Sequence, residues 1–439
     1  MPQESLQPRL GLASATAAVA GEAIAVGIFL TPAGMAKAVG SPFWLLVVWL
    51  VVGAMTVSGA LCYGELAGRF PRTGGTYVYL EEAYGRGVAF LYGWMCLLVL
   101  DPGLTAALAT GIAGYAGYIA HWAPMTMKAA AASLICGLCA LNAISIRLSA
   151  GFLRWITWLK FAVLALLTLW AFAFRLGSWS NFMPFFSQHA GSLPLAPGLG
   201  AAMVGAFFSF GGWWDVSKIA GEVRDPRRTL PRAMVLGVLA VIAAYILVSA
   251  VFLYLVPVEK VASDETFVAQ AGAVLFGPAG GTAFALIVIV CVLGGMAAFM
   301  ISAPRVYYAM AGDGLFLKEV ARLHPRFGTP VVAIAIQGAA ASLLVIVGNF
   351  EQIIAYFIFA AVVFLGLAVS GLFVFRRTQP APKGVILTAG YPATALAFLG
   401  LVLLLLVLVA VRNPRESLLG SAVVLAGLPV YGIFHRGRA

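Results

Sequence analysis

The sequence predicts an all-α membrane protein with twelve transmembrane helices, and two observations lead to this fold class. First, 62% of the 439 residues are hydrophobic and only 10% are charged, whereas a soluble domain has about 25% charged residues. No soluble fold of this size can hide so much apolar surface, which excludes an ordinary soluble enzyme. Second, the apolar runs are about 20 residues long, the length that a membrane-spanning helix needs and a barrel strand does not.

Charged or Gly/Pro-rich breaks divide the apolar runs into twelve expected spans. They lie near residues 12–36, 42–66, 87–120, 127–146, 152–175, 198–218, 233–256, 280–308, 329–348, 352–375, 385–410 and 416–435. Each hydrophilic stretch between them has room for one short helix at most. We therefore expect residues 1–439 to form a single transmembrane domain.

The basic residues orient this map in the membrane. If the N-terminus is cytoplasmic, 20 of the 27 lysines and arginines, Lys218 among them, fall on the cytoplasmic side and six fall outside. Lys160 remains within the fifth span. Cytoplasmic loops of membrane proteins carry an excess of basic residues, so we expect both termini to be cytoplasmic and the cell inner (plasma) membrane to be the location. Cationic loops on the cytoplasmic side of a lipid bilayer also explain the net charge of +11. No nucleic acid partner is therefore expected.

Two spans carry glycine and an acidic residue near their middle. The first contains GEAIAVGIF at 21–29, and the sixth contains FSFGGWWD at 208–215. These two spans head two five-helix halves, and paired interrupted helices are typical of a transporter's midplane binding site. Lipid cannot satisfy the backbone groups that unwinding exposes, so these groups must line a cavity. The alternative, which the spacing leaves open, is that the glycines only permit close helix packing.

A break of this kind has a definite chemistry. The N-terminus of the restarted helix attracts an anionic group such as a carboxylate. The freed carbonyl oxygens accept hydrogen bonds from an ammonium group. A pair of facing breaks therefore suits a small molecule that carries both groups, or an amine.

Four motifs follow one another within residues 15–330. They are GIF at 27–29, YGEL at 63–66 with FPRTGGTYVYL at 70–80, FGGW at 210–213 with EVRDPRRTLP at 222–231, and RVYYAMAGDG at 305–314 with HPRF at 324–327. Together they resemble the amino acid–polyamine–organocation (APC) superfamily, and within it the LAT-like amino acid permeases. The resemblance implies an inverted repeat of five plus five helices with discontinuous helices 1 and 6. Repeat one would cover about 12–175, repeat two about 198–375, and helices 11 and 12 about 385–435.

The resemblance also implies where a substrate binds. In similar proteins the carboxylate of an amino acid meets backbone amides of the first break, and its α-amino group meets carbonyls at both breaks, beneath an aromatic lid. The substrate-binding candidates are Glu22, Ala23, Ile24, Ala25, Val26, Gly27, Asp101, Phe208, Phe210, Gly211 and Asp215. Similar proteins commonly have Gly-small-Gly at the first break, whereas here only Gly27 remains and the neighbouring Ala25 and Val26 shield the amides more.

Lys160 is the basic residue within a span. An ionisable side chain at bilayer depth costs about 2.5–3.5 kcal/mol on insertion scales, so its presence there has to be explained by a structural or functional role. In LAT-like permeases a lysine at this place resembles a built-in cation that stands where related symporters bind sodium, between helices 1 and 8. The alternative is that Lys160 snorkels to the cytoplasmic surface. The first interpretation predicts transport that does not need sodium.

The acidic residues of the spans each have two interpretations. Glu22, together with Asp101 or Asp215, could give negative charge to a cationic substrate or carry a proton, whereas the two aspartates could instead cap helices. Glu65 and Glu222 lie beside arginines at cytoplasmic span ends. They are candidates for a salt-bridge gate or for a solvated inner face, and Phe208 is the third gate candidate.

The expected function is sodium-independent secondary transport of an amino acid by alternating access, as an exchanger or coupled to protons. The alternative is a polyamine or cationic amine antiporter on the same fold. A membrane-embedded enzyme would need a catalytic cluster at a membrane–loop boundary, and the sequence has none in a consistent place. We expect no cofactor and no metal site, and the sequence does not indicate whether a partner subunit exists.

Overall fold

The computed structural model describes residues 10–24, 27–72, 74–144, 150–257, 267–303 and 331–436, and a few positions between 306 and 324. Within these residues the chain is helical, and its one β contact is an isolated bridge between Leu10 and Val223. Ten helices of this described part are long and apolar enough to cross a membrane. Two shorter apolar helices, Ala162–Ala173 and Val331–Val347, lie where the fifth and ninth spans are expected. The twelve-span fold class is therefore confirmed.

The first five spans are built from these helices. They are α1 (Leu12–Ala23), α2 (Gly27–Leu30) and α3 (Pro32–Val39); α4 (Pro42–Arg69); α6 (Arg86–Met95), η1 (Cys96–Leu100) and α7 (Asp101–Ala120); α8 (Pro124–Ile144); and α9 (Ala150–Ala173). The short helix α5 (Thr76–Tyr84) lies between the second and third spans. The first span is interrupted, as the sequence predicts.

The other seven spans follow the same map. They are α10 (Leu195–Phe210) with the 3₁₀ helix η3 (Asp215–Glu222); α11 (Pro226–Leu255); α12 (Phe267–Ser302); α14 (Val331–Val347); α15 (Phe350–Thr378); α16 (Ala393–Arg412); and α17 (Pro414–Leu425) with α18 (Gly427–Arg436). A short 3₁₀ turn, η2 (Trp179–Phe182), precedes the sixth span. The sixth span is the second interrupted one.

Local sequence sets several helix ends. Pro42 and Pro226 stand in the first turn of α4 and α11, where a fixed φ favours the helix and the missing N–H has no cost. Gly40 ends α3 in the left-handed region at φ 59°, a conformation that glycine adopts without strain. At α15 the side chains of Asn349 and Gln352 form a reciprocal capping box, which satisfies two backbone donors.

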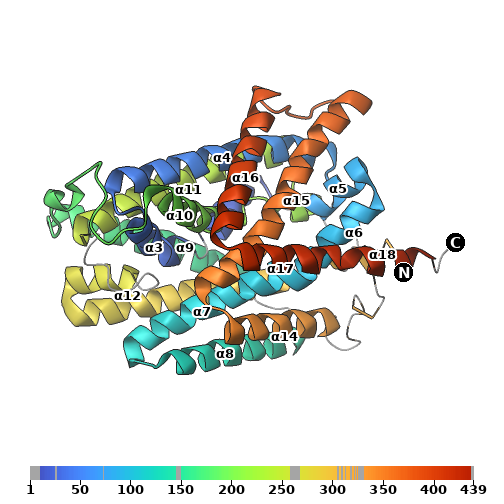
Figure 1. Ribbon diagram of the computed structural model, residues 1–439. Helices are drawn as coiled ribbons and strands as arrows, with labels where there is room; N and C mark the ends of the chain where they lie inside the picture. Colours follow the sequence, from blue (N-terminus) through green and yellow to red (C-terminus); the bar gives the residue numbers. More distant parts are fainter. Residues whose placement is uncertain are drawn as a thin grey trace.

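The spans form two groups of packed helices. Figure 1 shows α4, α10 and α11 on one side of the molecule and α7, α8, α12 and α14 on the other. In the first group, α11 packs along both α4 and α1, and a Cβ added to Gly64 of α4 would lie 2.9 Å from the Cα of Pro231 in α11. Small residues permit such close backbone approach, so α4 and α11 pack tightly against each other. The division into two sequence repeats stays a prediction.

The first described residues and the last helix lie at the same end of the molecule. The backbone N–H of Arg224, just before α11, donates to the carbonyl oxygen of Leu10 at 2.8 Å. Tyr431 of α18 packs against Phe90 of α6, with ring centroids 5.4 Å apart. The starts of the first, third and seventh spans and the end of the twelfth thus share one end, called the basic end below, as an even number of spans requires. Which compartment this end faces stays a prediction.

Candidate functional site

The first span breaks where the sequence predicts. Helix α1 ends at Ala23, Ile24 is its C-cap, and α2 begins at Gly27. Ala25 and Val26 lie outside the described residues, so binding of a carboxylate by their amides stays a prediction. Thr31 separates α2 from α3, and Pro32 restarts the helix. The span is therefore discontinuous near its middle.

The sixth span breaks at two glycines. Helix α10 ends at Phe210, Gly211 has an extended ψ of 150°, and Gly212 has φ 97°. Residues other than glycine rarely adopt a positive φ of this kind. The 3₁₀ helix η3 then begins at Asp215. The sixth span is discontinuous over the same short stretch that the glycines mark in the sequence.

The two breaks face one another. A Cβ added to Gly27 would lie 2.0 Å from the Cα of Ser209, so only glycine fits there. The hydroxyl groups of Thr31 and Ser209 are hydrogen-bonded to each other across the two spans. On the other side of the break, a Cβ on Gly212 would lie 3.2 Å from the Cβ of Glu22. The prediction that discontinuous helices 1 and 6 meet is confirmed.

A tyrosine that the sequence did not single out joins both breaks. Tyr245 of α11 is fully buried, and its hydroxyl oxygen lies 2.7 Å from the carbonyl oxygen of Ala23 and 2.6 Å from that of Ser209. Its ring packs against Trp49 and Phe210, each with centroids 5.1 Å away. One aromatic residue in an apolar span gives no sequence signal of such a role.

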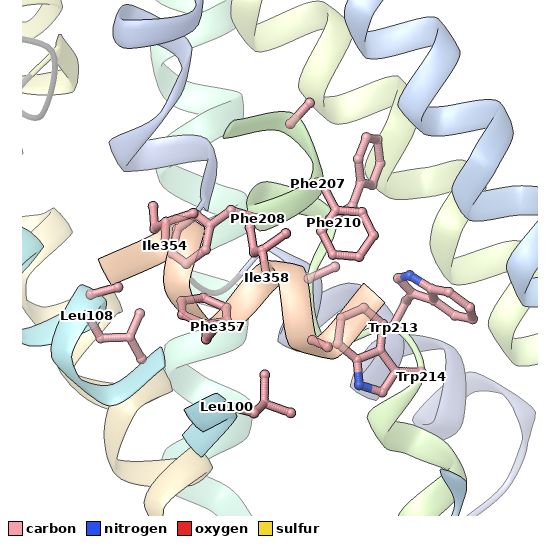
Figure 2. Packing of buried hydrophobic residues seen from close by; sticks show 14 of the residues in the cluster. Leu100, Leu108, Phe207, Phe208, Phe210, Trp213, Trp214, Ile354, Phe357 and Ile358 are labelled. Atoms are coloured by element: carbon pink, nitrogen blue, oxygen red, sulfur yellow. The ribbon is translucent and has the colours of Figure 1, made fainter. Parts of the chain in front are cut away.

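Phe208 lies among aromatic and aliphatic side chains of α15. Figure 2 shows it beside Ile354 and Phe357, and its ring centroid is 6.1 Å from that of Phe357 and 5.8 Å from that of Phe350. Phe208 therefore lies where α10 packs against α15, close to the sixth-span break. The side chain is buried.

A pocket of about 310 Å³ lies next to Phe208, at the end of the molecule opposite the basic end. It is lined by residues of α3, α10 and α15, including Val204, Gly205, Phe350 and Ile354. Leu30 and Thr31 of the interrupted first span also line the pocket, and Phe208 packs against Phe350 in its wall. The role of Phe208 as an aromatic lid stays a prediction.

Lys160 is buried in α9, with a side chain only 3% exposed. A snorkelling lysine keeps its ammonium group in water, so that alternative does not describe this structure. The side chain interacts electrostatically with Cys291 of α12 and Glu22 of α1. Lys160 therefore lies where the fifth, eighth and first spans approach one another.

Asp101, Asp215 and an unexpected partner, Lys218, form a buried cluster. Asp101 is 1% exposed and accepts a hydrogen bond from the Tyr307 hydroxyl at Oδ2, while its Oδ1 has no hydrogen-bond partner among the described residues. The ammonium nitrogen of Lys218 lies 2.7 Å from Oδ1 of Asp215, and Lys218 also interacts electrostatically with Asp101. A π-helical segment, η1, directly precedes Asp101, and such segments recur at functional sites.

Lys218, which the charge count places on the cytoplasmic side, is buried and only 4% exposed. The 3₁₀ geometry of η3 places residues i and i+3 on one face, which brings Lys218 onto Asp215. Asp101 and Asp215 lie in the first turns of α7 and η3, as the capping alternative expects, and the N-cap positions themselves are held by Leu100 and Trp214.

Glu65 forms a buried ion-pair network at the basic end. Its carboxylate, which is fully buried, accepts hydrogen bonds from Arg69 at 3.0 Å, from Arg376 at 2.6 and 3.1 Å, and from the backbone N–H of Thr388 at 2.8 Å. The network joins α4 to α15 and to the segment before α16, so a solvated inner face is the wrong interpretation for Glu65. The side chain of Glu222 lies outside the described residues, and its gate role stays a prediction.

Loop contacts close the same end. The backbone N–H of Gly74 donates to the carbonyl oxygen of Lys218 at 3.3 Å. The hydroxyl of Tyr77 in α5 donates to Oδ2 of Asp313 at 2.9 Å, and burial together with this neighbouring carboxylate raises the pKa of Tyr77 above its usual range. These contacts lie at the basic end, whereas the pocket beside Phe208 lies at the other end.

Comparisons with known proteins agree with this architecture. Residues 10–434 match the family model described as amino acid permease. The chain is 28% identical to the serine/threonine exchanger SteT of Bacillus subtilis (strain 168), over 97% of this chain and 96% of that protein. It is 29% identical to the human b(0,+)-type amino acid transporter 1, over 98% and 88%. It is 26% identical to the Asc-type amino acid transporter 1 of Mus musculus, over 99% and 83%.

The family match covers nearly the whole chain, and the matches to the relatives cover most of the length of those proteins. The resemblance inferred from the four motifs is confirmed, and with it the multi-pass membrane character. The chain belongs to the amino acid permease family and is a membrane transporter of amino acids rather than an enzyme.

Proposed function

We propose that this permease is a sodium-independent exchanger of neutral amino acids that works by alternating access, with the substrate held between the breaks of the first and sixth spans. The observation that carries the proposal is the meeting of the two breaks, where Gly27 lies against Ser209. Unwound backbone inside a membrane has to line a binding cavity. The carboxylate would occupy the start of α2, and the ammonium group would occupy the end of α1 and α10.

Lys160 supports the absence of a sodium requirement. A buried ammonium group beside the first and eighth spans already supplies the positive charge that a bound cation would bring. A second cation at the same place would be repelled by it. Lys160 is therefore proposed as the substitute for sodium, with coupling to protons as the remaining alternative to obligatory exchange.

The proposed cycle moves substrate between the two ends of the molecule. The Glu65 network joins α4 and α15 at the basic end, and the pocket beside Phe208 is at the other end, which supports an arrangement with the basic end closed. We propose that the basic end faces the cytoplasm of a cell with this protein in its inner (plasma) membrane, because cytoplasmic loops are rich in lysine and arginine. The outer gate residue would then be Phe208, and the inner gate residues would be Glu65 and Glu222.

Neutral amino acids are favoured over cationic amines. The relatives include a serine/threonine exchanger and a large neutral amino acids transporter small subunit. Asp215 is ion-paired with Lys218, and the same lysine interacts electrostatically with Asp101, so the charge of both carboxylates is already met by a cation of the protein. A polyamine or cationic amine antiporter would depend on Glu22, and Glu22→Gln should then change the transport of lysine and agmatine but not of alanine.

Liposomes reconstituted with the purified protein test the proposal. Uptake of radiolabelled serine, alanine or leucine should require unlabelled amino acid inside the liposomes and should be equal in sodium and choline buffers. A proton-coupled mechanism would instead give uptake into empty liposomes under an inward proton gradient. Uptake that needs sodium, or that occurs with agmatine and not with any amino acid, would contradict the proposal.

A further inference from the structure

We propose that the pocket beside Phe208 is a second amino acid site, in which Arg412 binds the carboxylate and Glu351 binds the ammonium group of a neutral amino acid. The inference rests on the proposed function, because it places a further binding site on the path to the helix breaks. It concerns the rim and the floor of the pocket and not the breaks themselves.

The rim of the pocket carries one positive and one negative side chain. Glu351 lies in the first turn of α15, and Arg412 is the last residue of α16. Both line the pocket, and Nη2 of Arg412 lies 3.7 Å from Oε2 of Glu351. This distance exceeds the roughly 2.7–3.2 Å of an N–H···O hydrogen bond. The two groups therefore attract one another and still have hydrogen-bonding positions for a ligand.

A ligand can separate this pair at little cost. The side chain of Arg412 is 26% exposed and that of Glu351 is 70% exposed, and water screens an exposed pair so that it contributes little to stability. The planar guanidinium group can donate two parallel hydrogen bonds to a carboxylate, while the carboxylate of Glu351 accepts from an ammonium group. A zwitterion satisfies both side chains, whereas a simple cation or anion would be repelled by one of them.

The floor of the pocket is apolar. Its lining includes Leu30, Met35, Val204, Phe350 and Ile354. The volume of about 310 Å³ is at the lower end of the range of about 300–1,000 Å³ that small-molecule pockets occupy. An amino acid with its two charged groups at the rim would place its side chain against this floor. The pocket should therefore bind leucine more tightly than serine.

The charged rim is displaced from the helix breaks along α15. Glu351 precedes Phe357 by six residues, which is about 9 Å of helix, and the ring of Phe357 is the one that lies 6.1 Å from that of Phe208. Leu30 and Thr31, next to the first break, line the inner part of the pocket. An amino acid at the rim is thus on the way to the breaks without occupying them, so two amino acids can be bound at once.

Equilibrium binding of radiolabelled leucine to the purified protein tests the inference. The wild-type protein should bind two leucines per chain at saturation. Arg412→Gln removes the charge that binds the carboxylate and should bind one, and its initial rate of exchange at low external leucine should fall about threefold or more. Arg415→Gln is the matched control, because Arg415 is an exposed arginine in the first turn of α17 at the same end. The control should bind two leucines.

Reversal of the two charges separates binding from a merely structural role. In a structural role each charge would only complement the dipole of its own helix, since Glu351 is at the start of α15 and Arg412 at the end of α16. The double variant Arg412→Glu with Glu351→Arg loses that complementarity but keeps opposite charges at the rim. We expect it to regain the second leucine that Arg412→Gln lacks, although its melting temperature falls. If Arg412→Gln still binds two leucines and only its melting temperature falls, the inference is overturned.

The wild-type measurement keeps the inference falsifiable even if the variants fail to fold. A wild-type protein that exchanges amino acids but binds one leucine per chain at saturation would overturn it without any variant. Absence of amino acid exchange by the wild-type protein would instead contradict the proposed function, so the two failures are distinguishable.

Discussion

Glu65 of α4 and Arg376 of α15 form a two-contact ion pair, in which Nη2 lies 2.6 Å from Oε2 and Nε lies 3.1 Å from Oε1. The two residues are 311 positions apart in the sequence, and Glu65 is fully buried. The pair therefore joins two distant spans at the basic end of the molecule.

Breaking this pair should loosen the closed end. Glu65→Gln leaves Arg69 and Arg376 without their shared counter-ion, and loss of one partner of a buried pair costs about 3–5 kcal/mol. We expect the melting temperature in detergent to fall by several degrees. Glu82→Gln is the control, because Glu82 pairs with Arg72 near the surface, where such a pair contributes about 0–1 kcal/mol. Equal shifts in the two variants would show that the Glu65 pair contributes no more than a surface pair.

A methyl group at the crossing of the two breaks should stop transport. In Gly27→Ala the new Cβ would meet the Cα of Ser209 at 2.0 Å, so one of the broken spans has to move away. We expect exchange to fall at least about tenfold. The matched change is Gly137→Ala in α8, where an added Cβ has nothing within 4 Å and alanine improves the helix by up to about 1 kcal/mol. Normal exchange by Gly27→Ala would contradict the close approach of the breaks.

Removal of the buried ammonium group should abolish exchange. Lys160→Met keeps the length and apolar character of the side chain but takes away the charge near Glu22. We expect exchange in sodium-free liposomes to fall by at least about tenfold. Lys128→Met serves as the comparison, because Lys128 lies near the start of α8 and donates to the carbonyl of Ile346. Wild-type exchange by Lys160→Met would remove Lys160 from the mechanism.

The stability of the protein should depend on the charge balance of the buried cluster, which consists of Asp101, Asp215 and Lys218, rather than on any one of these residues. Lys218→Met leaves two buried carboxylates without their cation, which should destabilise the protein by about 3–5 kcal/mol. Adding Asp215→Asn removes one of the two negative charges and should restore part of the melting temperature. If the double variant is less stable than Lys218→Met by the full effect of Asp215→Asn alone, the residues do not interact.

The sequence predicts the spans and their breaks well because both depend on local composition. A run of about 20 apolar residues has to cross the bilayer, and glycines beside an acidic residue interrupt it at residues 21–27 and 208–215. The partners of individual side chains follow from the register between distant helices, which composition does not encode. Arg376 as the partner of Glu65, and Tyr245 as the link between breaks, are of this kind.

Lys218 illustrates the limit of the charge count. Its place at the end of an apolar span made it look like a loop cation, although Asp215 three residues earlier is the sequence feature that points to an internal pair. The substrate-binding, gating and sodium-substitute roles of the individual residues stay predictions, since they concern a bound state and a moving protein.

The hydrogen bond between Arg224 and Leu10 ties the segment ahead of α1 to the turn before α11. In the proposed alternating-access cycle, release of solute at this end would separate the two segments and rupture the bond. A fluorophore coupled at residue 10 and a quencher coupled at residue 224 would then brighten with each such excursion. This pair of positions would thereby give an optical readout of the turnover rate.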